Sequence, residues 1–116
     1  MGCAGLADLY WDGAGVTADK SKTFQYNQKA CELENAHGCN NLGVFYQNGI
    51  TVTADLAKAN EYFQRACELK EGDGCYNLAE SYKRGLGIKA DKSMAIVYYR
   101  KACYLYIPIV LGDNPV

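Results

Sequence analysis

The sequence lacks the features that several large classes of protein require. It has no apolar run near the ~20 residues of a membrane-spanning helix. Its 12 basic and 13 acidic residues nearly balance, so it offers no charge excess to a nucleic acid or an anionic membrane. It has one histidine, His37, whereas metallohydrolases need several such ligands. We therefore expect no membrane span, no nucleic-acid partner, and no metal or other cofactor.

The sequence is instead dominated by an internal repeat of 36 residues, which accounts for all six cysteines. The cysteines alternate at separations of 28 and 8 residues, and their neighbours recur with them. The recurring positions include Gly2-Cys3, Gly38-Cys39 and Gly74-Cys75, then Leu6, Leu42 and Leu78, then Tyr10, Tyr46 and Tyr82, and finally Gly13, Gly49 and Gly85. A fixed period of this length is typical of a stacked array whose units share one continuous core.

Each unit has the apolar pattern of two helices. In the first half, Cys3, Leu6 and Tyr10 lie on one helical face, and the second half carries Tyr26 and Leu33 on one stripe. We therefore predict an all-α fold: a right-handed α/α superhelix (solenoid) of three antiparallel helix-pair repeats. One domain would cover residues 1–105, with units at about residues 2–37, 38–73 and 74–105.

The connections between these helices are predicted to be short. Gly13 can end a first helix in the left-handed conformation, and the Asp19 carboxylate can cap a second helix by accepting backbone N–H groups. A turn at residues 35–37, which includes His37 as a solvated residue, would lead into the next unit. In the middle unit, residues 49–52 read Gly-Ile-Thr-Val, which predicts a loop of a different shape there.

These residues closely resemble the Sel1-like repeat, a tetratricopeptide-like helix pair. More narrowly, they resemble the cysteine-rich Hcp-type proteins of Helicobacter, over roughly residues 2–105. The resemblance rests on three units of the form Gly-Cys-x-x-Leu…Tyr-x-x-Gly…Ala-Asp…Tyr…Ala-Cys. It implies a secreted or periplasmic array that acts as an interaction scaffold. Some members of that family are described as weak penicillin-binding proteins or β-lactamases.

Two disulfide ladders fit the cysteine spacing. Pairing at 28 residues would join the two helices of each unit, and pairing at 8 residues would join consecutive units through Cys31–Cys39 and Cys67–Cys75. Loop closure slightly favours the longer separation, at about 3.6 against about 2.6 kcal/mol. The shorter separation places its cysteines evenly about the turn centred on Asn35, which favours it. The resemblance implies the shorter pairing as well.

The inter-unit ladder leaves Cys3 and Cys103 over, and we expect them to be free or to pair outside this pattern. An even number of cysteines at a strict spacing implies disulfides and an oxidising compartment. Met1 stands directly before the first repeat, so the chain reads as a mature or excised segment whose signal peptide is not included. We therefore expect a secreted or periplasmic protein.

No catalytic constellation can be recognised in the sequence. Penicillin-recognising serine enzymes need Ser-x-x-Lys, Ser-Asp-Asn and Lys-Thr-Gly. Ser21 is instead followed by a lysine one position later, and Ser81 by a lysine two positions later. We therefore predict a non-catalytic scaffold that binds a protein or peptide partner and is itself a monomer. The alternative is a weak penicillin-binding or β-lactamase-type activity, which the resemblance alone implies.

The binding site is predicted on the first helices, on the face turned away from the core. First helices of such solenoids line the concave groove in which extended peptides lie. An asparagine amide can donate to and accept from a peptide backbone, so Asn41 and Asn77 are candidate clamps whose loss should leave stability nearly unchanged. The face consists of Gly5, Asp8 and Asp12, of Asn41, Val44 and Asn48, and of Asn77, Glu80 and Arg84.

The repeat pattern fails after Cys103. The template asks for Gly-Cys at positions 110–111, where the chain has Val110 and Leu111. Pro108 argues against a helix that continues through it. We therefore predict that residues 106–116 are an atypical apolar tail, either a cap folded over the last helix or an exposed apolar patch.

Overall fold

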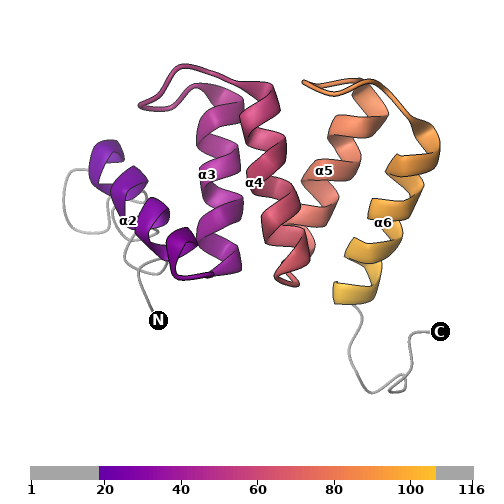
Figure 1. Ribbon diagram of the computed structural model, residues 1–116, viewed down its shortest axis with the longest axis horizontal. Coiled ribbons are helices and arrows are strands. Elements are labelled where there is room, and N and C mark those ends of the chain that lie inside the picture. The colour runs from indigo at the N-terminus through magenta and orange to yellow at the C-terminus, as the bar shows by residue number, and fades with distance from the viewer. Residues whose placement is uncertain (1–18, 107–116) are drawn as a thin grey trace.

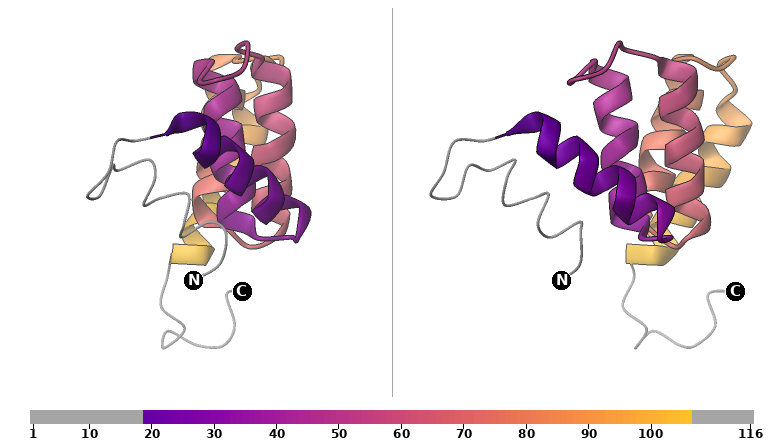
Figure 2. Two further views of the ribbon diagram at one scale, coloured as in Figure 1. Left: turned by 90° about the vertical axis from the view of Figure 1, so that its left-hand side faces the viewer. Right: turned by 60° about the vertical axis from the view of Figure 1, so that its left-hand side comes forward.

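The computed structural model describes residues 19–106, which form a row of α-helices (Figure 1). The helices are α2 (Lys20–Glu32), α3 (Ala36–Asn48), α4 (Leu56–Glu68), α5 (Gly72–Arg84) and α6 (Lys92–Tyr106). Consecutive helices run antiparallel, and α2 is inclined against the others (Figures 1 and 2). Residues 19–106 contain no strand, and none of their helices has both the length and the apolar character needed to cross a bilayer. The fold is an all-α solenoid, as the repeat predicts.

The signals that begin and end the helices act as the sequence predicts. The carboxylates of Asp19, Asp55 and Asp91 each accept a hydrogen bond of 3.0–3.1 Å from the backbone N–H three residues later. These bonds satisfy one of the unpaired donors at the start of α2, α4 and α6. Helices α3 and α5 end at Gly49 and Gly85, whose φ angles are 67° and 68°, a conformation that glycine adopts without steric cost.

The predicted turn at residues 35–37 is wrong. Helix α3 already begins at Ala36, and His37 lies in its first turn. The reason is that Asn35 is an N-cap, since its side chain accepts a hydrogen bond of 2.9 Å from the Gly38 backbone N–H. A short polar side chain in this position stabilises a helix start.

The prediction of a differently shaped loop in the middle unit is also wrong. Thr51 has a φ of 60°, close to the 73° of Gly87 at the corresponding position. Both loops close with the same backbone hydrogen bond. The Asp55 N–H donates to the Tyr46 carbonyl oxygen (2.8 Å), and the Asp91 N–H donates to the Tyr82 carbonyl oxygen (2.9 Å). Thr51 therefore takes a left-handed conformation that is unfavourable for a β-branched residue.

Consecutive units approach each other through glycine. A Cβ atom placed on Gly74, at the start of α5, would lie 2.6 Å from Ala66 Cβ and 2.9 Å from the carbonyl oxygen of Phe63 in α4. A Cβ atom placed on Gly38 in α3 would likewise lie 2.6 Å from Ala30 Cβ in α2. A residue without a side chain is therefore needed at each junction between units.

The same two junctions carry disulfides. Cys31–Cys39 joins α2 to α3 and Cys67–Cys75 joins α4 to α5, each with a Cα–Cα distance of 4.6 Å. For these four residues the structure holds the pairing at eight residues rather than the one at 28. Cys103 is a free, exposed thiol, and Cys3 lies outside the described residues, as do the apolar residues 107–116.

Within the second and third units, tyrosines at repeated positions stack across the helix pair. The Tyr46 and Tyr62 rings are 5.6 Å apart and the Tyr82 and Tyr98 rings 5.8 Å apart, both nearly parallel. They flank buried cores, of which the central one contains Phe63 from α4 together with Ala59 and Leu78. Burial of these apolar side chains is the main force that holds the stack together.

Candidate binding face

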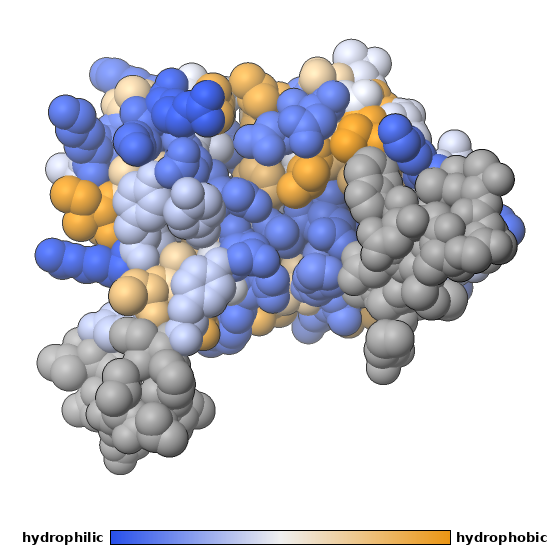
Figure 3. All heavy atoms as spheres, turned by 180° about the vertical axis from the view of Figure 1, so that it is seen from behind, coloured by the Kyte–Doolittle hydropathy of each residue, from blue (hydrophilic) through white to orange (hydrophobic). Residues whose placement is uncertain are grey.

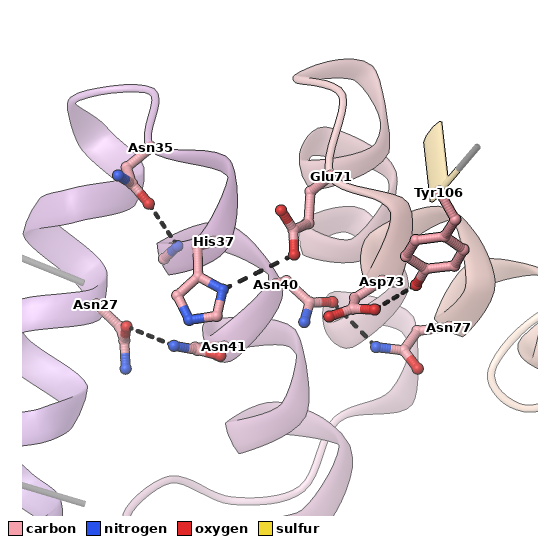
Figure 4. Close-up of polar contacts among 10 residues, drawn as sticks. Asn27, Asn35, His37, Asn40, Asn41, Glu71, Asp73, Asn77 and Tyr106 are labelled. Atoms are coloured by element: carbon pink, nitrogen blue, oxygen red, sulfur yellow. Dashed lines mark hydrogen bonds and ion pairs between the residues drawn. The ribbon is translucent and has the colours of Figure 1, made fainter. Parts of the chain in front are cut away.

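A row of four asparagine side chains crosses α2, α3 and α5 (Figure 4). The Asn41 Nδ2 donates a hydrogen bond of 3.1 Å to the Oδ1 of Asn27. The Asn77 Nδ2 donates one of 3.0 Å to the Oδ1 of Asn40. We call Asn27, Asn40, Asn41 and Asn77 the amide row.

The close junction between α2 and α3 explains the first of these bonds. Gly38 lies on Ala30, and in an antiparallel helix pair the residues one turn further, Asn41 and Asn27, meet next. At the following junction the position of Asn27 is occupied by Phe63, which is buried in the core. Asn77 therefore finds no asparagine at this position of α4, and it bonds to Asn40 of α3 instead.

The amide row holds two asparagines in the interior. Asn27 is 0% exposed and Asn40 is 6% exposed. A buried amide is costly unless it is hydrogen-bonded, and the Asn27 Nδ2 has no hydrogen-bond partner among the described residues. The bond from Asn41 thus satisfies the Oδ1 of Asn27, which is the only side-chain atom of Asn27 with a partner among the described residues. Asn41 and Asn77 therefore have a structural role, because they hydrogen-bond these interior asparagines.

Asn41 and Asn77 also keep hydrogen-bonding capacity for a ligand. Both side chains are partly exposed. Each uses Nδ2 as a donor inside the protein, which leaves its Oδ1 and a second N–H available within the described part of the chain. Because the internal bond fixes the amide plane, these free groups are held in one orientation.

The other predicted residues of the face have different environments. Val44 does not lie on a free surface: it packs against the core of Ala59, Phe63 and Leu78, because α4 covers this side of α3. Asn48 and Arg84 are exposed, at the last positions of α3 and α5. Glu80 is half-buried. Gly5, Asp8 and Asp12 lie outside the described residues.

Two carboxylates at the α5–α6 end of the face are engaged by tyrosine hydroxyls. Tyr99 donates to Glu80, and Tyr106 donates to Asp73. The hydrogen bond to Glu80, with burial, raises the pKa of Tyr99 to about 12, since a carboxylate acceptor favours the neutral phenol. Burial, followed by the bond to Asp73, raises the pKa of Tyr106 to about 12.

Further polar and aromatic groups join α3 to α5 and α6. The Nδ1 of His37 lies 3.8 Å from the Oε2 of Glu71 (Figure 4). Tyr76 is 46% exposed, and its ring meets that of Tyr99 edge-on at 5.7 Å. Seen from behind, the middle of the molecule is mostly hydrophilic (Figure 3). The face therefore combines amides, carboxylates and an exposed aromatic ring.

A hollow of about 400 Å³ lies elsewhere, between α4 and α6. Its walls include the Cys67–Cys75 disulfide, Tyr98, Lys101 and Leu105, and none of the amide row. Within residues 19–106, no group of three or more His, Cys, Asp or Glu side chains could hold a metal ion. The chemistry that the described residues arrange is hydrogen bonding and charge, which suits recognition.

Sequence reasoning missed Asn27, Asn40 and the tyrosine–carboxylate pairs. One signal could have found Asn27, because it stands where the other units have Phe63 and Tyr99. A polar residue at a position that is otherwise aromatic is a sign of a buried polar contact. The tyrosine–carboxylate pairs have no such signal, because they join residues that are not related by the repeat.

Comparisons with known proteins place this fold among others of its kind. The sequence matches the family model described as Sel1 repeat at residues 1–35, 36–71 and 72–106. The structure is similar to that of cysteine-rich protein B of Helicobacter pylori, with 36% identity and a TM-score of 0.76 over 97% of this chain and 86% of that one. A comparison with curated proteins gives no match.

Two longer proteins contain a similar array. A Sel1 repeat protein from Oxalobacter formigenes is 27% identical with a TM-score of 0.84, over 89% of this chain and 42% of that one. A protective antigen of uropathogenic Escherichia coli with an SLR fold is 28% identical with a TM-score of 0.84, over 90% of this chain and 22% of that one. The present chain spans less than half the length of either protein.

Proposed function

Because the chain belongs to the Sel1 repeat family, we propose that it is a non-catalytic scaffold that binds an extended segment of a protein partner along the amide row. The observation that carries this proposal is the arrangement of Asn41 and Asn77. Each donates one N–H inside the protein and keeps an acceptor and a second donor for a peptide backbone. Fixing these amides before binding lowers the entropy that association costs.

The charges beside the amide row favour a partner with a basic residue. Glu71, Asp73 and Glu80 lie along α5 on the side of the amide row, whereas the exposed basic side chains Lys83 and Arg84 are confined to the last turn of α5. Complementary charges guide encounter and select the partner. Tyr76, which is exposed, offers a ring for an aromatic or cationic side chain. We expect the partner segment to place a lysine or arginine near α5.

The disulfides bear on the compartment in which the protein works. Two disulfides join the units, and disulfides persist in oxidising surroundings. The similar Helicobacter protein is also described as cysteine-rich. We propose a secreted or periplasmic location, where the partner would be a protein of the same compartment or of a cell that it meets.

Selection from a random peptide library on the immobilised, disulfide-bonded protein tests this function. We expect enrichment of peptides that carry a lysine or arginine, and we expect their binding to weaken at least about fivefold when Asn41 and Asn77 are both changed to alanine. Gln64→Ala is the matched control, since it removes an exposed amide from α4, beside the hollow. Equal loss in both variants, or no enrichment at all, would reject the amide row as the binding site.

A further inference from the structure

The hollow between α4 and α6 has a largely apolar lining that is open to solvent. Both helices pack against α5, from which the hollow also draws part of its wall (Figure 1). The apolar lining consists of the Cys67–Cys75 disulfide, the rings of Tyr98 and Tyr104, and Leu105. Its volume of about 400 Å³ falls near the lower end of the range of small-molecule sites, about 300–1,000 Å³. The hollow therefore has the size of a site for a small organic ligand.

The opening at Leu105 is not a general property of the repeat. At the first junction between units the counterpart of Leu105 is Leu69, which is half-buried and packs against the core around the Cys31–Cys39 disulfide. Leu105 is instead 37% exposed and lines the hollow beside the second disulfide. The second junction thus leaves open an apolar surface that the first junction covers.

The charges around the hollow are also reversed relative to the first junction. The hollow is lined by one acidic residue, Glu68, and by two basic residues, Lys70 and Lys101. With Tyr104 included, the corresponding positions one repeat earlier hold three acidic residues and one basic residue, which are Glu32, Glu34, Arg65 and Glu68. A net negative set is therefore replaced by a net positive one, which favours an anion at the hollow.

Two ammonium groups are available to such an anion. The Nζ of Lys101 lies 4.9 Å from the centroid of the Tyr98 ring, whose negative face attracts it. Neither Lys70 nor Lys101 has a carboxylate partner among residues 19–106. The Glu68 carboxylate instead accepts a hydrogen bond of 3.4 Å from Gln64. Both ammonium groups therefore keep their N–H donors for a ligand.

We propose that the hollow binds a small aromatic carboxylate. The aromatic body lies against the disulfide, Tyr104 and Leu105, and the carboxylate lies at Lys70 and Lys101. Contact with a second ring and burial of apolar area favour the aromatic body, and charge-assisted hydrogen bonds orient the carboxylate. No residue of the amide row lines the hollow, so this inference does not depend on the peptide-binding function proposed above.

Two ligands that differ only in charge test the role of the lysines. Indole-3-acetate and indole-3-acetamide share one ring system, and only the acetate is an anion at neutral pH. We expect an NMR titration of the isotope-labelled, disulfide-bonded protein at low ionic strength to shift backbone signals around Lys101 and Leu105 with both ligands. The Kd of the acetate should be at least about threefold lower than that of the acetamide. The proposal is overturned if these signals do not shift, if the shifts lie elsewhere, or if both ligands bind equally.

Two lysine variants and one control assign the difference in affinity to the hollow. Lys101→Gln and Lys70→Glu should each raise the Kd of the acetate about threefold or more, and should change that of the acetamide less than about twofold. Lys70→Glu is compatible with the fold, because Lys70 has a φ of 75° and its counterpart Glu34 has a φ of 63°. Lys58→Gln is the matched control, since Lys58 also lies over a tyrosine ring, that of Tyr46 at 5.3 Å, but does not line the hollow. An equal loss of acetate binding in the control would overturn the proposed site.

Discussion

Replacing Asn41 with alanine tests whether the amide row holds consecutive units together. Asn27 is completely buried, and the hydrogen bond that satisfies it comes from Asn41. The Nδ2 of Asn27 already has no partner among the described residues. Asn41→Ala would leave both polar atoms of a buried amide unpaired. We expect this to lower the free energy of unfolding by about 1–3 kcal/mol. If Asn41 only bound a ligand at the surface, the free energy of unfolding would hardly change.

Two further variants separate this effect from a simple loss of contact. Asn27→Leu combined with Asn41→Ala removes the stranded amide and places an apolar residue where the other units have Phe63 and Tyr99. We expect the double variant to recover most of the stability. Asn77→Ala should cost less, about 0.5–1.5 kcal/mol, because its partner Asn40 is 6% exposed and retains some access to water.

Urea denaturation followed by circular dichroism, with the disulfides intact, measures these differences. All variants should keep the same slope, so that a change of midpoint reports stability alone. The reasoning is refuted if Asn41→Ala unfolds at the same urea concentration as the original protein. It is also refuted if the double variant is no more stable than Asn41→Ala.

The remaining predictions concern packing, pH and catalysis. Gly74→Ala should lower the free energy of unfolding in urea by at least about 1 kcal/mol despite its better helix propensity, because the new Cβ would lie 2.6 Å from Ala66 Cβ; an unchanged midpoint would contradict the close junction. The pKa of Tyr99 is raised from 10.0 to about 12, so its contribution to stability is complete below pH 10 and is lost as the pH rises toward 12. The melting temperature of Tyr99→Phe should therefore fall less steeply between pH 10 and pH 12 than that of the original protein. Equal slopes of melting temperature against pH would count against the bond to Glu80. The purified protein should not hydrolyse nitrocefin, and turnover that follows the protein through purification would favour the penicillin-binding alternative.

The helices and most of their ends could be predicted from the sequence, because they depend on residues that recur every 36 positions. The recurrence of the cysteines left two disulfide ladders open, and the choice of the shorter one rested on its position about the turn and on the family resemblance. Repetition turns a weak local signal into a strong one: Asp19, Asp55 and Asp91 all cap helices. The shape of the middle loop could not be predicted, since Thr51 takes a glycine-like conformation that its own preference opposes. The contacts imposed by the neighbouring helices outweigh that local preference.

The candidate site was predicted only in part, because it depends on contacts between units rather than on the repeat itself. Helical spacing placed Asn41 and Asn77 on the first helices, but it could not show that they bond to Asn27 and Asn40. The same spacing put Val44 on the free face, where α4 in fact covers it. A position on one helix does not specify which neighbouring helix lies against it.

The most direct test of peptide binding along the amide row is an NMR titration of the isotope-labelled, disulfide-bonded protein with a peptide from the library selection. The side-chain amide signals of Asn41 and Asn77 should shift together with backbone signals of α3 and α5, with one common affinity. Shifts confined to residues around Lys101 and the hollow between α4 and α6, with Asn41 and Asn77 unmoved, would contradict the proposed site.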